Sequence, residues 1–97
     1  MGTMEKARRA ADVAVVELCL AIDRRRLRQS IQDFPNPYRA DLLRIVRSIE
    51  DQYNACSRFA PSCHAFSDVT KLKEMIAQVF VSIEEFDKWF LLAQLSV

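Results

Sequence analysis

Two cysteines and the single histidine form the only sequence cluster whose residue types could bind a metal ion. Cys56, Cys63 and His64 follow the pattern Cys-x6-Cys-His, and thiolate and imidazole are ligands that zinc prefers. A structural zinc site needs four ligands, usually in closely spaced pairs, and the fourth here would be Asp68 or a distant residue. We therefore interpret the cysteines as core-facing thiols, and we predict no metal and no cofactor. A Cys56–Cys63 disulfide stays an alternative for an oxidising compartment.

The sequence offers no arrangement of groups for catalysis. Nucleophilic catalysis needs a cysteine or serine beside a base, and Cys63 cannot easily use His64, its immediate neighbour on a loop. The adjacent Glu84 and Glu85 point about 100° apart on a helix, so they cannot flank one substrate atom. The only glycine is Gly2, which excludes a glycine-rich phosphate loop or a nucleophile elbow. We predict no catalytic residue and no enzymatic activity.

A cluster of arginines is the strongest indication of nucleic-acid binding. Its members lie within one short stretch: Arg24, Arg25, Arg26 and Arg28. Such a cluster could contact phosphates, but acidic residues flank it, no aromatic residue interleaves it, and the net charge of the chain is only +1. Residues 62–97 carry five acidic residues against three lysines, which favours pairing of the cluster with an acidic C-terminal helix. A small helical nucleic-acid-binding regulator is the alternative function.

Helices must carry these groups, because proline and glycine are absent over long stretches. Neither residue interrupts 4–32, so we predict one continuous helix there, with Thr3 as its cap. Pro35 ends this helix, and Asn36 followed by Pro37 favours a second helix over 37–59. The short connection makes the two helices antiparallel neighbours.

The last third of the chain predicts another long helix. Pro61 stops the second helix, and apolar residues at helical spacing run from about Asp68 to Leu95. Ser82 and Glu85 form a capping-box pattern, which leaves open a break near residue 81 and a fourth helix, although we favour the unbroken one. The predicted core includes residues from all three helices: Leu20, Leu42, Ile49, Ile76 and Ile83.

The predicted first helix is apolar on two opposite sides. At about 100° per residue, the first stripe contains Val13, Val16, Leu20, Leu27, Ile31 and Phe34. The second stripe, about 180° away, contains Ala11, Val15, Leu18 and Ile22. We assign the first stripe to the core and expect the second to form a solvent-facing patch of a kind that monomers avoid. A homodimer with antiparallel first helices would bury the second stripe, and a fourth helix folded over it is the alternative.

Together these features predict an all-α fold: an antiparallel bundle of three long helices in a single domain over residues 1–97. We interpret residues 1–3 as a candidate cloning remnant before a natural start at Met4.

Three apolar residues near the C-terminus lie off the core-facing stripe of the last helix and add to the predicted interface: Leu91, Leu92 and Leu95. The predicted function is a non-enzymatic protein-interaction module, such as an adaptor, a chaperone-like partner or a dimerisation domain. We recognise no family and expect a protein partner, in the first place a second copy, rather than a membrane or a small-molecule substrate.

The expected location is intracellular and cytoplasmic. Three cysteines without a Cys-x-x-Cys pair suit a reducing compartment better than a disulfide framework. No apolar run approaches the roughly 20 residues that span a membrane. A basic segment does precede the apolar residues of the first helix, but Asp12 and Glu17 interrupt them, which argues against a secretory signal.

Overall fold

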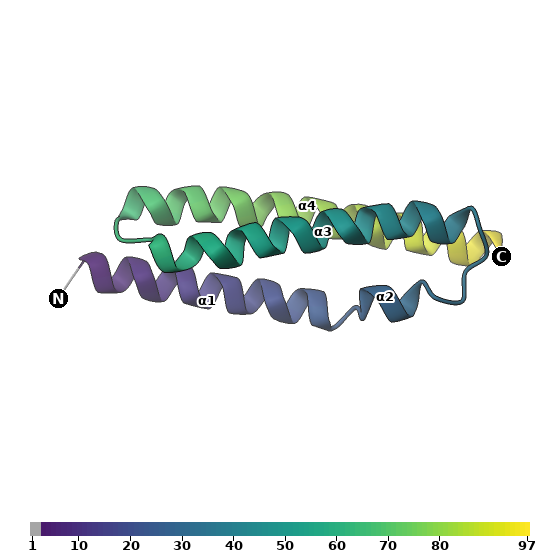
Figure 1. Cartoon of the computed structure of the whole chain (residues 1–97), viewed down its shortest axis with the longest axis horizontal. Coiled ribbons are helices and arrows are strands. Elements are labelled where there is room, and N and C mark those ends of the chain that lie inside the picture. The colour runs from purple at the N-terminus through teal and green to yellow at the C-terminus, as the bar shows by residue number, and fades with distance from the viewer. Residues whose placement is uncertain (1–2) are drawn as a thin grey trace.

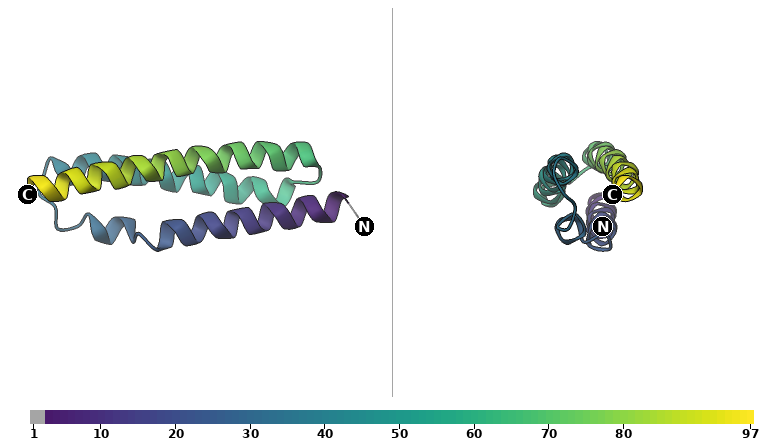
Figure 2. Two further views of the ribbon diagram at one scale, coloured as in Figure 1. Left: turned by 180° about the vertical axis from the view of Figure 1, so that it is seen from behind. Right: turned by 90° about the vertical axis from the view of Figure 1, so that its right-hand side faces the viewer.

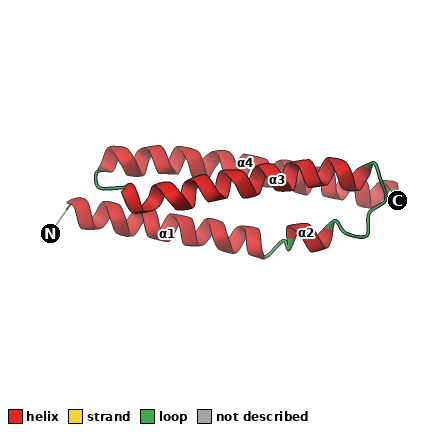
Figure 3. Cartoon of the chain, viewed as in Figure 1, coloured by secondary structure: helices red, strands yellow, loops and turns green. Residues whose placement is uncertain are grey.

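The computed structural model describes residues 3–97, and within that range it contains helices and turns but no strand. The elements in chain order are α1 (Thr3–Asp23), α2 (Leu27–Ser30), α3 (Tyr38–Phe59), the 3-10 turn η1 (Ala60–Ser62) and α4 (Phe66–Ser96). The predicted all-α class is confirmed (Figure 3). The interpretation of residues 1–3 as cloning-derived falls on Met1 and Gly2, which lie outside the described residues, and on Thr3, whose side chain is not described.

The chain runs along an elongated bundle three times, and we call each pass a side. The bundle measures 55 × 18 × 18 Å. The first side consists of α1 followed by α2, the second is α3 and the third is α4 (Figure 1). Viewed from the end, the sides lie at the corners of a triangle (Figure 2). Since α3 runs back along the bundle, it is antiparallel to both α1 and α4, and α1 and α4 are parallel. The predicted three-sided antiparallel bundle is therefore confirmed, and α4 packs on both other sides.

The helix α4 is continuous over 31 residues, as the favoured alternative predicted. Ser82 does not act as a helix cap. It is buried in the middle of α4, where its hydroxyl donates to the carbonyl of Gln78 and accepts a hydrogen bond of 3.0 Å from the side-chain amide of Gln52 on α3. A serine can satisfy its hydroxyl on the preceding turn without ending a helix.

The predicted continuous helix over 4–32 is wrong, because the chain turns between α1 and α2. The backbone hydrogen bonds tighten there, with the N–H of Arg25 donating to Ile22 and the N–H of Arg26 donating to Asp23. Arg26 then takes a left-handed conformation, with φ 45° and ψ 57°, and α2 begins at Leu27. A left-handed arginine costs about 1–2 kcal/mol relative to the helical conformation, so the fold must regain that free energy by packing.

The turn at Arg26 reverses which face of the first helix points inward. Leu18 and Leu27 are nine residues apart, which on a continuous helix would place them about 180° from each other. In the structure both are buried. The core therefore takes residues of the second stripe, such as Ala11 and Leu18, before the turn, and Leu27 and Ile31 of the first stripe after it. Burial of both segments is the gain that offsets the conformation of Arg26.

The remaining core follows the sequence prediction closely. Leu42 and Ile49 on α3, and Ile76 and Ile83 on α4, are buried as predicted. Leu20 is not, because it lies on the outer side of α1, and its assignment to the core was wrong. Three phenylalanines from α4 and the α2–α3 connection pack together near the C-terminal end: Phe34, Phe86 and Phe90.

Candidate protein-interaction surfaces

The outer side of α1 carries an exposed apolar stripe, which we call the outer stripe: Val13, Val16 and Leu20. Their exposed fractions are 51%, 57% and 49%. The steps of three and four residues place all three on one face of the helix. Beside Val13, a shallow depression between α1 and α4 is lined by charged and small residues, among them Arg9, Glu17 and Lys73. An apolar stripe with a charged border is the usual composition of a protein-contact surface.

The predicted interface on α1 lies largely inside the bundle. Ala11 and Leu18 have no exposed surface, and Val15 and Ile22 are partly buried against the core. The expectation that these four residues face solvent in a single chain was wrong, and the reason is the reversal at Arg26. The exposed face of α1 is the opposite one, formed by residues that sequence reasoning had assigned to the core.

A second exposed apolar patch lies at the C-terminal end of α4. Leu91, Leu92 and Leu95 are all exposed there, in agreement with their predicted position off the core stripe. No acidic or basic residue occurs in the segment from Phe90 to Val97. This patch is thus a second candidate contact surface, and it lies at the end of the bundle where the C-terminus is marked (Figure 1).

The arginine cluster is divided between structural and exposed members. Arg25 makes a two-point ion pair with Asp87 of α4, at 3.0 Å for both hydrogen bonds, and also donates to the carbonyl of Ala21. The hydrogen bonds to Asp87 raise the pKa of Arg25. Pairing with the acidic C-terminal helix thus occurs as predicted for this residue, which ties the turn to α4.

The last arginine of the cluster pairs with α3. Arg28 donates two hydrogen bonds, of 2.8 and 2.6 Å, to the carboxylate of Glu50. These hydrogen bonds hold the pKa of Glu50 below its usual range. Arg24 and Arg26 are exposed on the turn, so only two of the four arginines are left for a phosphate or an acidic partner.

The thiols and the histidine do not assemble a reactive site. Cys56 and Cys63 are buried free thiols, and Cys19 is partly exposed. Burial raises the pKa of both buried thiols, which keeps them protonated and poorly nucleophilic. His64 uses its backbone N–H to donate to the carboxylate of Asp68 at 3.0 Å. Within residues 3–97, no group of three metal-binding side chains comes together.

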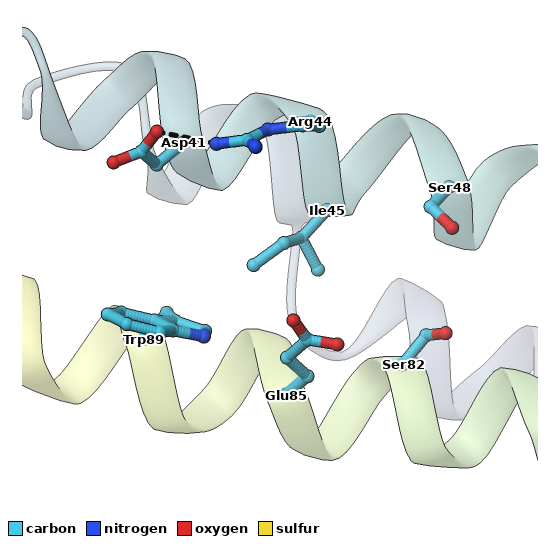
Figure 4. A pocket seen from close by; sticks show the side chains of 7 residues that line it. All are labelled: Asp41, Arg44, Ile45, Ser48, Ser82, Glu85 and Trp89. Atoms are coloured by element: carbon cyan, nitrogen blue, oxygen red, sulfur yellow. Dashed lines mark hydrogen bonds and ion pairs between the residues drawn. The ribbon is translucent and has the colours of Figure 1, made fainter.

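A groove between α3 and α4 was missed by sequence reasoning. It is lined by Asp41, Arg44, Ile45 and Ser48 of α3 and by Ser82, Glu85 and Trp89 of α4 (Figure 4). The carboxylate of Asp41 and the guanidinium of Arg44 form an ion pair of 2.6 Å on one wall, and the Trp89 ring lies on the other. The sequence signal that could have indicated it is Trp89, a large aromatic residue that lies three positions after the core residue Phe86 and is itself exposed. The lining thus combines charged, hydroxyl and apolar side chains.

Comparison with family models, with curated proteins and with solved structures yields no match to this chain. Among the described residues, no helix combines the length and apolarity needed to cross a membrane.

Proposed function

We propose that this chain is a non-enzymatic protein-interaction module that contacts its partner through exposed apolar helix faces. The observation that carries the proposal is the outer stripe of α1, where Val13, Val16 and Leu20 are about half exposed. Burial of apolar surface is the main favourable term in protein association. The charged border of the stripe would fix the orientation of the partner.

The alternative of nucleic-acid binding has weaker support. Arg25 and Arg28 already satisfy carboxylates of the same chain, so a phosphate would have to compete with those ion pairs. Arg24 and Arg26 alone would give a small number of phosphate contacts and a shallow salt dependence. Binding of a fluorescent DNA or RNA duplex at low salt, lost in an Arg24→Glu plus Arg26→Glu variant, would favour this alternative over the protein-interaction module.

We also propose that the chain works in a reducing compartment such as the cytoplasm. Its three cysteines are free thiols, and Cys56 and Cys63 are buried where they pack as small apolar groups. Cells are quenched in a denaturing acid, and a maleimide of high mass added to the denatured lysate at neutral pH should label all three cysteines. An oxidised pair at Cys56 and Cys63 would contradict this location.

Site-specific photo-crosslinking in the native cell tests the interaction module most directly. A photoreactive phenylalanine analogue replaces Val16 in one variant and Leu92 in a second. In a matched control it replaces Arg47, an exposed residue on α3. We expect discrete crosslinked products from position 16 or 92 and none from 47. Absence of products at both apolar positions, at native abundance, would contradict the proposal.

A further inference from the structure

We propose that the partner on the outer stripe is a second copy of this chain, whose α1 packs antiparallel to the first. This inference rests on the proposed function, because it names the partner of the same surface. It differs from the dimer predicted from the sequence, which used Ala11 and Leu18. Those residues are fully buried in the single chain and are not free to contact another copy.

The outer stripe continues at both ends into exposed charged residues with the same spacing. Lys6, Val13 and Leu20 are spaced seven residues apart. A second series with the same spacing, shifted by three residues, consists of Arg9, Val16 and Asp23. This spacing is that of the a and d positions at which one helix packs along another, with three apolar residues in the middle and charged residues at both ends. All six residues, which we call the seam, are exposed. A second helix can therefore contact the seam along the whole of α1.

The charges of this seam have a direction that suits an antiparallel second copy. The N-terminal end carries the cations Lys6 and Arg9, and the C-terminal end carries the anion Asp23. Within residues 3–97, none of these three has an ion-pair partner. A parallel pair of α1 helices would place like charges together, whereas an antiparallel pair places the cations of each copy beside the carboxylate of the other.

One register of the antiparallel pair satisfies both the apolar and the charged positions. With Val13 of one copy opposite Val16 of the other, Leu20 lies opposite the aliphatic stem of Arg9, and Lys6 lies opposite Asp23. Because a two-fold axis relates the copies, each of these contacts occurs twice. Glu17 flanks the contact on one side, where the nearest equivalent position of the other copy is the uncharged Ala10, and Asp12, which is level with Glu17, lies on the other side.

The size of the seam predicts a weak, concentration-dependent dimer. A contact between two single helix faces falls below the roughly 1,200–2,000 Å² of stable interfaces. We therefore expect a dissociation constant in the micromolar range or weaker, on the order of 10–100 μM. Sedimentation velocity of the full chain from about 5 μM to about 1 mM spans this range. A chain that stays monomeric throughout overturns the inference, while crosslinks from Val16 to another protein would still support the proposed function.

Two substitutions in exposed apolar residues locate the dimer contact. Val16→Asp places a charge at the centre of the seam and should give a folded monomer at all concentrations. Leu92→Asp is the matched control, because it places the same charge on the other exposed patch and should leave the dissociation constant unchanged. Circular dichroism verifies that both variants keep the helical content of the wild type. Dissociation by Leu92→Asp and not by Val16→Asp would overturn the assignment of the dimer to α1.

A charge exchange on one chain tests the antiparallel direction. Asp23→Lys brings lysine against Lys6 of the other copy twice, and the dissociation constant should rise roughly tenfold at low salt. Adding Lys6→Glu recreates the opposite-charge pairs and should restore dimerisation. Both substitutions suit the helix dipole, with a cation at the C-terminal end of α1 and an anion near its N-terminal end, so neither destabilises the monomer. A double variant no tighter than Asp23→Lys would overturn the antiparallel contact.

Discussion

Leu18 and Leu27 both lie in the core, although they are nine positions apart, a spacing that would set them on opposite faces of one continuous helix. The turn at Arg26 makes this possible, since it rotates the chain by about half a helical turn between α1 and α2. The same rotation leaves Leu20 on the outside. The internal packing of α2 and the exposure of the outer stripe on α1 are thus two results of one backbone conformation.

Replacing Arg26 with glycine should give a more stable protein than replacing it with alanine. The left-handed conformation of Arg26, with φ 45°, carries no steric penalty for glycine, so Arg26→Gly should raise the free energy of unfolding by about 1 kcal/mol relative to Arg26→Ala. Urea denaturation of the two variants measures the difference. In a continuous helix the order would be reversed, because glycine costs about 1 kcal/mol relative to alanine in a helix interior.

The ion pair between Arg25 and Asp87 should contribute to stability. Arg25 is only partly exposed and also holds the carbonyl of Ala21, so Arg25→Ala should cost about 1 kcal/mol of the free energy of unfolding. A double-mutant cycle with Asp87→Asn isolates the coupling between the two side chains. Arg24→Ala is the control, and its effect should stay within about 0.5 kcal/mol. Equal effects of the two arginine substitutions would argue against a specific tie to α4.

Stability should fall in acid partly because of Glu50. The hydrogen bonds from Arg28 lower the pKa of Glu50 in the folded chain, below the value of about 4.3 for an unfolded glutamate. The stabilisation from this pair is therefore complete above the unfolded pKa and is lost as the pH falls through the folded one. Thermal unfolding between about pH 2 and 6 should show a smaller acid loss for Glu50→Gln than for wild type. Identical pH profiles would contradict the role of the pair.

The three thiols should react at two very different rates. Cys19 is partly exposed, whereas Cys56 and Cys63 are buried and burial raises the pKa of both. A disulfide reagent at pH 8 should modify one thiol of the native chain quickly and the other two only at the rate of unfolding. Cys19→Ser should remove the fast phase. A fast phase that persists in this variant would show that a buried thiol is accessible.

Much of the bundle could be predicted from the sequence because its local signals agree with its packing. The prolines at 35 and 61 separate the sides, and a single amphipathic stripe on α3 and on α4 identifies Leu42, Ile49, Ile76 and Ile83 as core. The turn before α2 could not be predicted, since it contains neither glycine nor proline. Both stripes of the first helix are apolar, and only packing against α3 and α4 decides which half of each is buried.

Because the turn before α2 was not predicted, the exposed face of α1 was also predicted wrongly. Once Leu20 was assigned to the core, Ala11 and Leu18 were left as the exposed face, and the true outer stripe was missed. The C-terminal leucines Leu91 and Leu92 were placed correctly, because α4 has one continuous phase from start to end. The pairing of Arg25 with the acidic C-terminal helix followed from the charge distribution alone.

Two substitutions within one turn of α1, on nearly opposite sides of the helix, test the central claim that Arg26 reverses the helix face and leaves the outer stripe free. The measurement is thermal unfolding, followed by circular dichroism, of Leu18→Glu and Leu20→Glu. We predict that Leu18→Glu, which buries an unpaired carboxylate, abolishes cooperative unfolding, while Leu20→Glu keeps the wild-type helical content and a similar Tm. An unfolded Leu20→Glu variant beside a stable, folded Leu18→Glu variant would contradict the account.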